Sequence, residues 1–157
     1  MRVLPFIDFR EFPMSKRFSA WSSGVALAML ALTQPAAAQS YSAYGSTAVA
    51  PTIYTKGSWY TVAFPVAGNP PSTAKVTYVY YRWSYGTPRP SGFQVLLCDH
   101  TGTLCSDVTA AASGAVNFTG RGVAANTGIR LYAQVAGTGT MLRVQGGSSS
   151  VTVNYSY

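Results

Sequence analysis

Few side chains in this sequence are able to move protons, attack a substrate or hold a metal. After residue 38 the only acids are Asp99 and Asp107, and the only histidine is His100. These three lie in or beside one short stretch, which does not suit the two carboxylates that flank a glycosidase substrate. No serine lies in a G-x-S-x-G nucleophile elbow. We therefore predict that the protein is not an enzyme and binds no cofactor; a triad assembled from separate loops is the alternative that stays open.

The two cysteines have the spacing of a disulfide across a hairpin. Cys98 and Cys105 are separated by six residues that include Gly102, which is typical of a turn. In a protein exported to an oxidising compartment, which the N-terminal residues predict below, such a pair is expected to form a disulfide. The chain-entropy model gives a loop this short a stabilisation of roughly 2 to 3 kcal/mol. The alternative is a metal site, but two thiols and His100 fall short of the usual four ligands.

An aromatic segment, YVYYRWSYGTPRPSG at residues 78–92, is the strongest candidate for a binding surface. With strand periodicity, one of its faces holds Thr77, Val79, Tyr81, Trp83 and Tyr85, and the other holds Val76, Tyr78, Tyr80, Arg82 and Ser84. The first face is predicted to lie in the core. On the second, tyrosine rings around a guanidinium suit stacking on a sugar or binding a partner's carboxylate. We predict partner binding by Tyr78, Tyr80 and Arg82, aided by Arg89 in the turn, although exposed tyrosines also occur on strands for packing reasons alone.

The elements that position these residues are predicted to be strands. Turn residues recur every 8 to 12 positions and no long stretch has helical spacing, which favours a single all-β domain, an antiparallel β-sandwich or barrel-like fold. The predicted strands cover residues 44–50, 59–66, 75–85, 93–98, 105–109, 115–119, 129–135, 142–145 and 151–155.

Residues 1–38 are predicted to be a secretory signal peptide. Lys16 and Arg17 precede the apolar run 25–32, and Ala36 and Ala38 supply a small-residue cleavage site, so we expect cleavage after Ala38. The apolar run is about half the roughly 20 residues that a membrane-spanning helix needs, which makes an uncleaved anchor the weaker alternative.

Residues 1–13 fit no part of such a signal. Met14 makes a better start, which suggests an over-long gene call. The expected mature domain, 39–157, has no stable membrane span.

The mature domain is predicted to be basic. The whole chain carries +7, and residues 1–38 hold four cations and two acids, which leaves +5. Seven cations scattered singly along the domain do not form a nucleic-acid-binding stripe. They favour an anionic partner outside the cytoplasm, such as an acidic protein patch, an acidic glycan or a lipid headgroup, or they serve only solubility.

Several motifs follow one another along residues 57–155. In chain order they are Tyr81-Arg82-Trp83, the P-x-P-x-G turn at 88–92, the strand 93–98 that ends in Leu-Cys, Cys105, the V-x-G-x-G step at 135–139 and the closing V-x-V-N-Y at 151–155. The order of these motifs resembles the FlhE family of small exported flagellar proteins.

The resemblance implies a periplasmic, non-enzymatic accessory of flagellar assembly. The family is associated with limiting proton leak through the flagellar export apparatus, and a component of that apparatus or of the basal body is the implied protein partner. The alternative is a secreted β-sandwich that binds carbohydrate or a cell-surface polymer through the same exposed tyrosines.

Overall fold

The structure is a computed structural model that describes residues 39–157. The predicted signal peptide, its cleavage after Ala38 and the alternative start at Met14 concern residues outside this described part. Ten strands and one short 3-10 helix, η1, form the domain. They are β1 (Tyr41–Val49), β2 (Ile53–Thr55), β3 (Tyr60–Phe64), β4 (Lys75–Arg82), β5 (Phe93–Asp99), β6 (Cys105–Asp107), β7 (Ser113–Asn117), η1 (Ala125–Thr127), β8 (Ile129–Val135), β9 (Thr140–Val144) and β10 (Ser148–Ser156).

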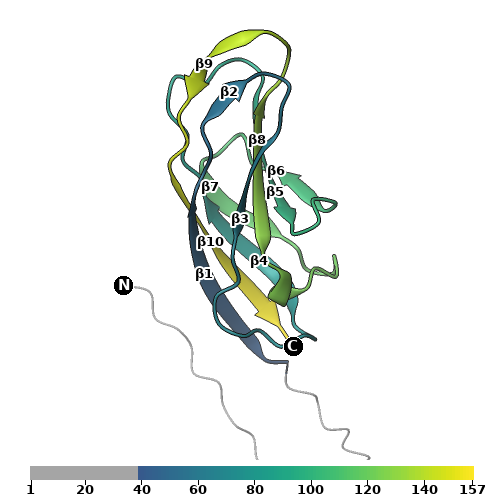
Figure 1. Cartoon of the computed structure of the whole chain (residues 1–157). Coiled ribbons are helices and arrows are strands. Elements are labelled where there is room, and N and C mark those ends of the chain that lie inside the picture. Colours follow the sequence, from purple (N-terminus) through teal and green to yellow (C-terminus); the bar gives the residue numbers. More distant parts are fainter. Residues whose placement is uncertain (1–38) are drawn as a thin grey trace, which may run out of the picture. The chain divides into compact units, whose positions relative to one another are not determined.

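Two antiparallel four-stranded sheets make up the body of the domain. We call them sheet A, with strand order β1-β10-β4-β7, and sheet C, with order β3-β8-β5-β6. A separate pair, β2-β9, lies at the end of the domain away from the C-terminus (Figure 1). The predicted all-β fold, an antiparallel sandwich or barrel-like domain, is therefore confirmed.

Alternating apolar residues from both sheets meet in one core. On β8 the side chains of Leu131, Ala133 and Val135 are buried, and on β10 those of Val151 and Val153 are buried. These strands were predicted from that alternation, and β8 has the predicted bounds. The strand β2 was not predicted, because three residues between Pro51 and Gly57 are too short for a pattern to show.

The predicted faces are correct along most of β4 and the three residues that follow it. Val79, Trp83 and Tyr85 are buried, whereas Tyr78, Tyr80 and Arg82 are exposed.

The assignment of Val76 to the solvent face is wrong. Val76 is buried, because the pairing of β4 with β10 shifts between Asn154, opposite Tyr78, and Tyr155, opposite Val76. Thr77 is the extra residue of this irregularity, and its hydroxyl donates to the Asn154 carbonyl over 3.1 Å. A β-bulge of this kind moves the residue before it to the other face of the sheet.

Candidate functional site

The outer face of sheet A brings three of the sequence-predicted binding residues together. Tyr78 and Tyr80 are 42 % and 52 % exposed, and Arg82 follows them on the same side of β4. Their cross-strand neighbours on β7 are Asn117, Ala115 and Ser113, respectively. Because short side chains flank them there, the two rings and the guanidinium stand clear of the sheet surface.

A groove of about 740 Å³ lies beside this row, along β1, β10 and the start of β4. Tyr41, which is 70 % exposed, and Tyr78 both line it. Its remaining lining residues are small or polar, and none is charged: Gln39, Ser42, Ala43, Thr77, Thr119, Asn154 and Ser156. Aromatic rings beside amides and hydroxyls suit a ligand with apolar faces and many hydroxyl groups.

Tyr41 is a site residue that the sequence reasoning missed. It lies opposite Ser156 in the pairing of β1 with β10. The Tyr41 hydroxyl donates to the Gln39 side-chain oxygen over 3.1 Å, and the Gln39 amide donates to the Ser156 hydroxyl over 3.0 Å. These bonds fix the rim of the groove. Only the pairing of the two ends of the domain reveals the place of Tyr41.

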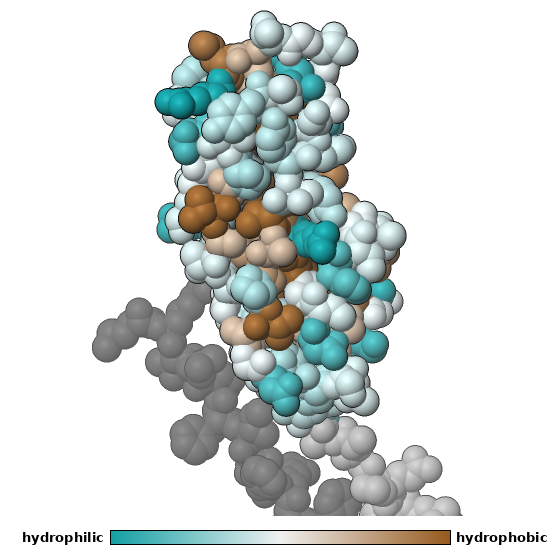
Figure 2. Space-filling model, in the orientation of Figure 1, coloured by the Kyte–Doolittle hydropathy of each residue, from teal (hydrophilic) through white to brown (hydrophobic). Residues whose placement is uncertain are grey.

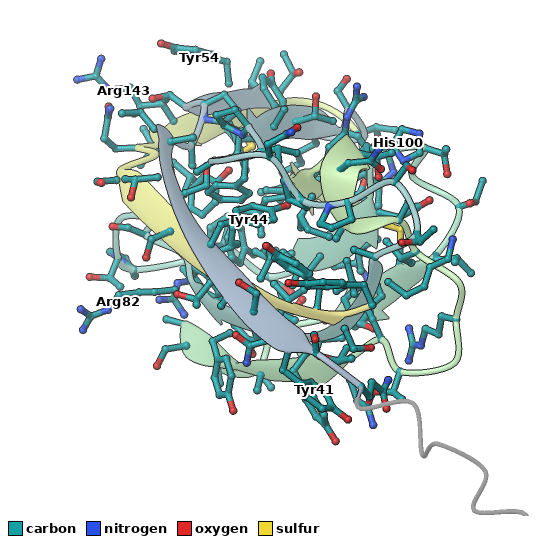
Figure 3. All side chains as sticks on the ribbon, turned by 90° about the horizontal axis from the view of Figure 1, so that it is seen from below. Tyr41, Tyr44, Tyr54, Arg82, His100 and Arg143 are labelled. Atoms are coloured by element: carbon teal, nitrogen blue, oxygen red, sulfur yellow. A yellow bond between two sulfur atoms is a disulfide. The ribbon has the colours of Figure 1, made fainter. Side chains whose placement is uncertain are left out.

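The structure does not bring Arg89 to this face. The Arg89 guanidinium carbon lies 4.5 Å from the centroid of the buried Trp83 ring and 5.9 Å from that of Phe93. Arg89 instead lines a second groove, of about 470 Å³, which also includes Lys56 and Arg143. In Figure 3, Arg82 and Arg143 point outward at separate places, whereas Tyr44 points into the interior.

The cysteine hairpin has the predicted form. Cys98 and Cys105 lie opposite each other on β5 and β6 and are joined by a disulfide with an S–S distance of 2.02 Å. The turn between them is held by the Asp99 carboxylate, which accepts the backbone N–H groups of Thr103 and Leu104 over 2.9 and 3.0 Å.

Both acids of the domain serve as local hydrogen-bond acceptors. Burial alone would raise the pKa of Asp99, but hydrogen bonds from Thr101 and from the backbone of the turn hold that pKa below its ordinary value. Hydrogen bonding by Thr109 likewise lowers the pKa of Asp107. Within residues 39–157 no group of three or more His, Cys, Asp or Glu side chains is arranged to hold a metal.

The outer face of sheet C carries a second aromatic pair that the sequence reasoning missed. Trp59 and Tyr132 pack edge to face with ring centroids 6.4 Å apart, beside a hollow of about 290 Å³. Tyr132 also packs against the turn of the cysteine hairpin at Gly102. The contact is so close that a Cβ added at Gly102 would lie only 2.6 Å from the Tyr132 hydroxyl. The strand alternation marked Tyr132 only as outward-facing, so its partner was not predictable.

Among the helices of the described residues, none has the length and apolar character needed to cross a membrane.

Comparisons with known proteins agree with the resemblance inferred from the motifs. The family described as flagellar protein FlhE matches residues 50–156, well over half of the chain. A crystal structure of FlhE is similar to this one with a TM-score of 0.61 and 25 % identity, over 73 % of this chain and 96 % of that chain. No curated protein matches the sequence. On the strength of the family match, the chain belongs to the FlhE family of flagellar accessory proteins.

Proposed function

We propose that this protein is a periplasmic, non-enzymatic factor that limits proton leak through the flagellar export apparatus. It docks on a component of that apparatus or of the basal body through the row Tyr78, Tyr80 and Arg82 on sheet A. Membership of the FlhE family supports the flagellar part of the proposal. The signal-like residues 1–38 and the Cys98–Cys105 disulfide support export to an oxidising compartment.

The observation that carries the docking proposal is the exposure of this row, whose neighbours on β7 have short side chains. Tyrosine and arginine are among the side chains that contribute most to protein interfaces, because they add large contact areas and charge-assisted hydrogen bonds. The two acids of the described domain, Asp99 and Asp107, belong to β5 and β6 of sheet C. Sheet A therefore presents Arg82 without a competing carboxylate, which suits an acidic patch on the partner.

The test is complementation of a deletion strain of the host, scored for swarming motility and for cytoplasmic pH after acid challenge. The variant Tyr78→Ser/Tyr80→Ser/Arg82→Ser is expected to reach normal levels outside the cytoplasm and to fail in both assays. The control Tyr54→Ser/Arg130→Ser removes an exposed tyrosine and an arginine elsewhere and should complement. Full complementation by the triple variant would rule out this face as the docking surface.

A second candidate function is glycan binding, which the uncharged groove beside the row favours. Sugar rings stack on tyrosine, and their hydroxyls bond to side chains such as Asn154 and Gln39. Binding of purified protein to cell-wall glycan, abolished by Tyr41→Ser/Tyr78→Ser, would support this function. It would replace the first proposal if the deletion strain also showed no flagellar or pH defect.

A further inference from the structure

Within residues 39–157, one edge of the strand β9 has no partner strand. Within residues 39–157, β9 pairs with β2 alone. Just beyond β9, the Gly86 N–H donates to the Gln145 carbonyl over 2.8 Å, and Tyr85 forms a bridge with Gly146. The chain that follows β4 thus pairs with residues 145 and 146 and does not continue along Thr140–Val144.

The reason the ladder stops is the turn at residues 87–90. Pro88 and Pro90 have no backbone N–H, so these two positions cannot donate hydrogen bonds to β9 and a regular ladder cannot continue here. The 470 Å³ groove lies beside β9, where a further strand would pair with it. Its walls are residues 86–90 on one side and residues 140–145 on the other.

Three cations and no acid line this groove. Lys56, Arg89 and Arg143 contribute to its walls, and neither Asp99 nor Asp107 does. The Arg89 guanidinium is already held in place by the Trp83 ring, so little of its conformational freedom would be lost on binding an anion. The groove therefore offers fixed positive charge to whatever enters it.

The groove also includes an apolar side chain, Leu142, that is almost fully exposed. Leu142 on β9 is 92 % exposed, and its neighbour Met141 is only half-buried. Figure 2 shows hydrophobic and strongly hydrophilic residues side by side at the end of the domain where Figure 1 places β9. An exposed leucine beside cations suits a ligand that alternates apolar and anionic side chains, as the two faces of an extended peptide do.

We propose that this groove receives an extended, acidic segment of a partner protein, which pairs with β9 as an added strand. In strand addition, backbone hydrogen bonds supply affinity and alternate side chains supply specificity. Here the peptide's carboxylates would face Lys56, Arg89 and Arg143, and an apolar side chain would contact Leu142. This site lies apart from the Tyr78, Tyr80 and Arg82 row and stands or falls independently of it.

The probe is a displayed library of random linear dodecapeptides, selected on the purified full-length protein with its disulfide intact. The selected peptides are expected to be acidic with apolar residues at alternate positions. Their binding should shift the backbone amide resonances of Thr140–Val144. Methylation of alternate backbone nitrogens in a selected peptide should abolish binding, because it removes the N–H groups that β9 carbonyls would accept.

A matched pair of charge variants tests the cations. Lys56→Ser/Arg143→Ser should weaken binding of the selected peptides at least about tenfold, since it removes two attractive charges from the groove. Lys75→Ser/Arg130→Ser removes a lysine and an arginine from other exposed positions and should leave the affinity unchanged.

Three results would overturn the proposal. The first is failure of the charge test: the selected peptides lack acidic residues, or they bind the two double variants with equal affinity. The second is binding to phosphatidylglycerol vesicles that requires Leu142 while no peptide is selected, which would assign the groove to a membrane surface. The third is self-association of Lys56→Ser/Arg143→Ser without peptide binding by the unmodified protein, which would mean that the charges only protect the edge.

Discussion

The guanidinium carbon of Arg89 lies 4.5 Å from the centroid of the Trp83 ring, so a residue of an exposed turn covers a residue of the core. Arg89→Ala is therefore expected to lower the free energy of unfolding by about 0.5 to 2 kcal/mol through loss of the cation–π contact and of packing. Urea denaturation measures the change. Arg82→Ala, on the open face of sheet A, is the control and should stay within about 0.5 kcal/mol of the parent. Equal effects of the two changes would contradict the structural role of Arg89.

Trp83 is expected to be among the most sensitive positions of the domain. Its side chain is buried, and its indole N–H donates to the Val108 carbonyl over 3.0 Å. Trp83→Ala should lower the free energy of unfolding by about 3 to 5 kcal/mol through the cavity that it leaves. Tyr80→Ser, on the solvent-facing side of β4, should change it by less than about 0.5 kcal/mol. A small loss for Trp83→Ala in denaturant unfolding would mean that the two faces of the segment 75–85 are wrongly assigned.

The difference between β8 and β4 shows how far sequence patterns reach in this fold. The alternation of Leu131, Ala133 and Val135 lies within one strand, so it predicted β8 with its bounds. The burial of Val76 depends on a shift in the pairing of two strands, which no single strand's pattern contains. Short strands such as β2 also lack enough residues for a period to appear.

The candidate site divides in the same way. The row of Tyr78, Tyr80 and Arg82 was predictable because period 2 places alternate residues on one face. The place of Tyr41 depends on the pairing of β1 with β10, and that of Arg89 depends on the path of a proline-containing turn. Contacts between distant segments of the chain therefore account for what the sequence reasoning missed.

Two buried tyrosines are expected to respond in opposite ways to loss of the hydroxyl. Burial raises the pKa of both Tyr85 and Tyr44 to about 12, with Tyr155 adding to the effect at Tyr44. The Tyr44 hydroxyl donates to the Ala125 carbonyl over 3.2 Å, whereas that of Tyr85 is buried without a hydrogen-bond partner among residues 39–157.

Tyr44→Phe should therefore lower the free energy of unfolding by about 1 kcal/mol, and Tyr85→Phe should leave it unchanged or raise it by up to about 1 kcal/mol. Thermal and urea unfolding of the two variants side by side give the comparison. A loss of stability in Tyr85→Phe as large as in Tyr44→Phe would show that the Tyr85 hydroxyl is satisfied.

The acid response of the fold is expected to depend on Asp99. Because the folded state holds the pKa of Asp99 below its ordinary value of 3.8, the ionised carboxylate stabilises the fold fully above that pH. This stabilisation is lost as the pH falls from 3.8 through the lower pKa of the folded state. Asp99→Asn should be less stable than the parent at pH 7, and the difference should shrink as the pH falls below 3.8. A constant difference across that range would contradict this role for the carboxylate.

The Cys98–Cys105 disulfide is expected to stabilise the fold, although hydrogen bonds to Asp99 also hold the turn that it closes. Cys98 is fully buried and Cys105 is exposed, so the bond ties a core strand to the edge strand β6. Thiol labelling of denatured, non-reduced protein should find no free thiol. The variant Cys98→Ala/Cys105→Ala should lose about 2 to 3 kcal/mol, as expected for a short closed loop. Because Asp99 still accepts the N–H groups of the turn, the variant should stay folded. A variant with the parent's stability would show that these turn bonds alone hold β6 to the sheet.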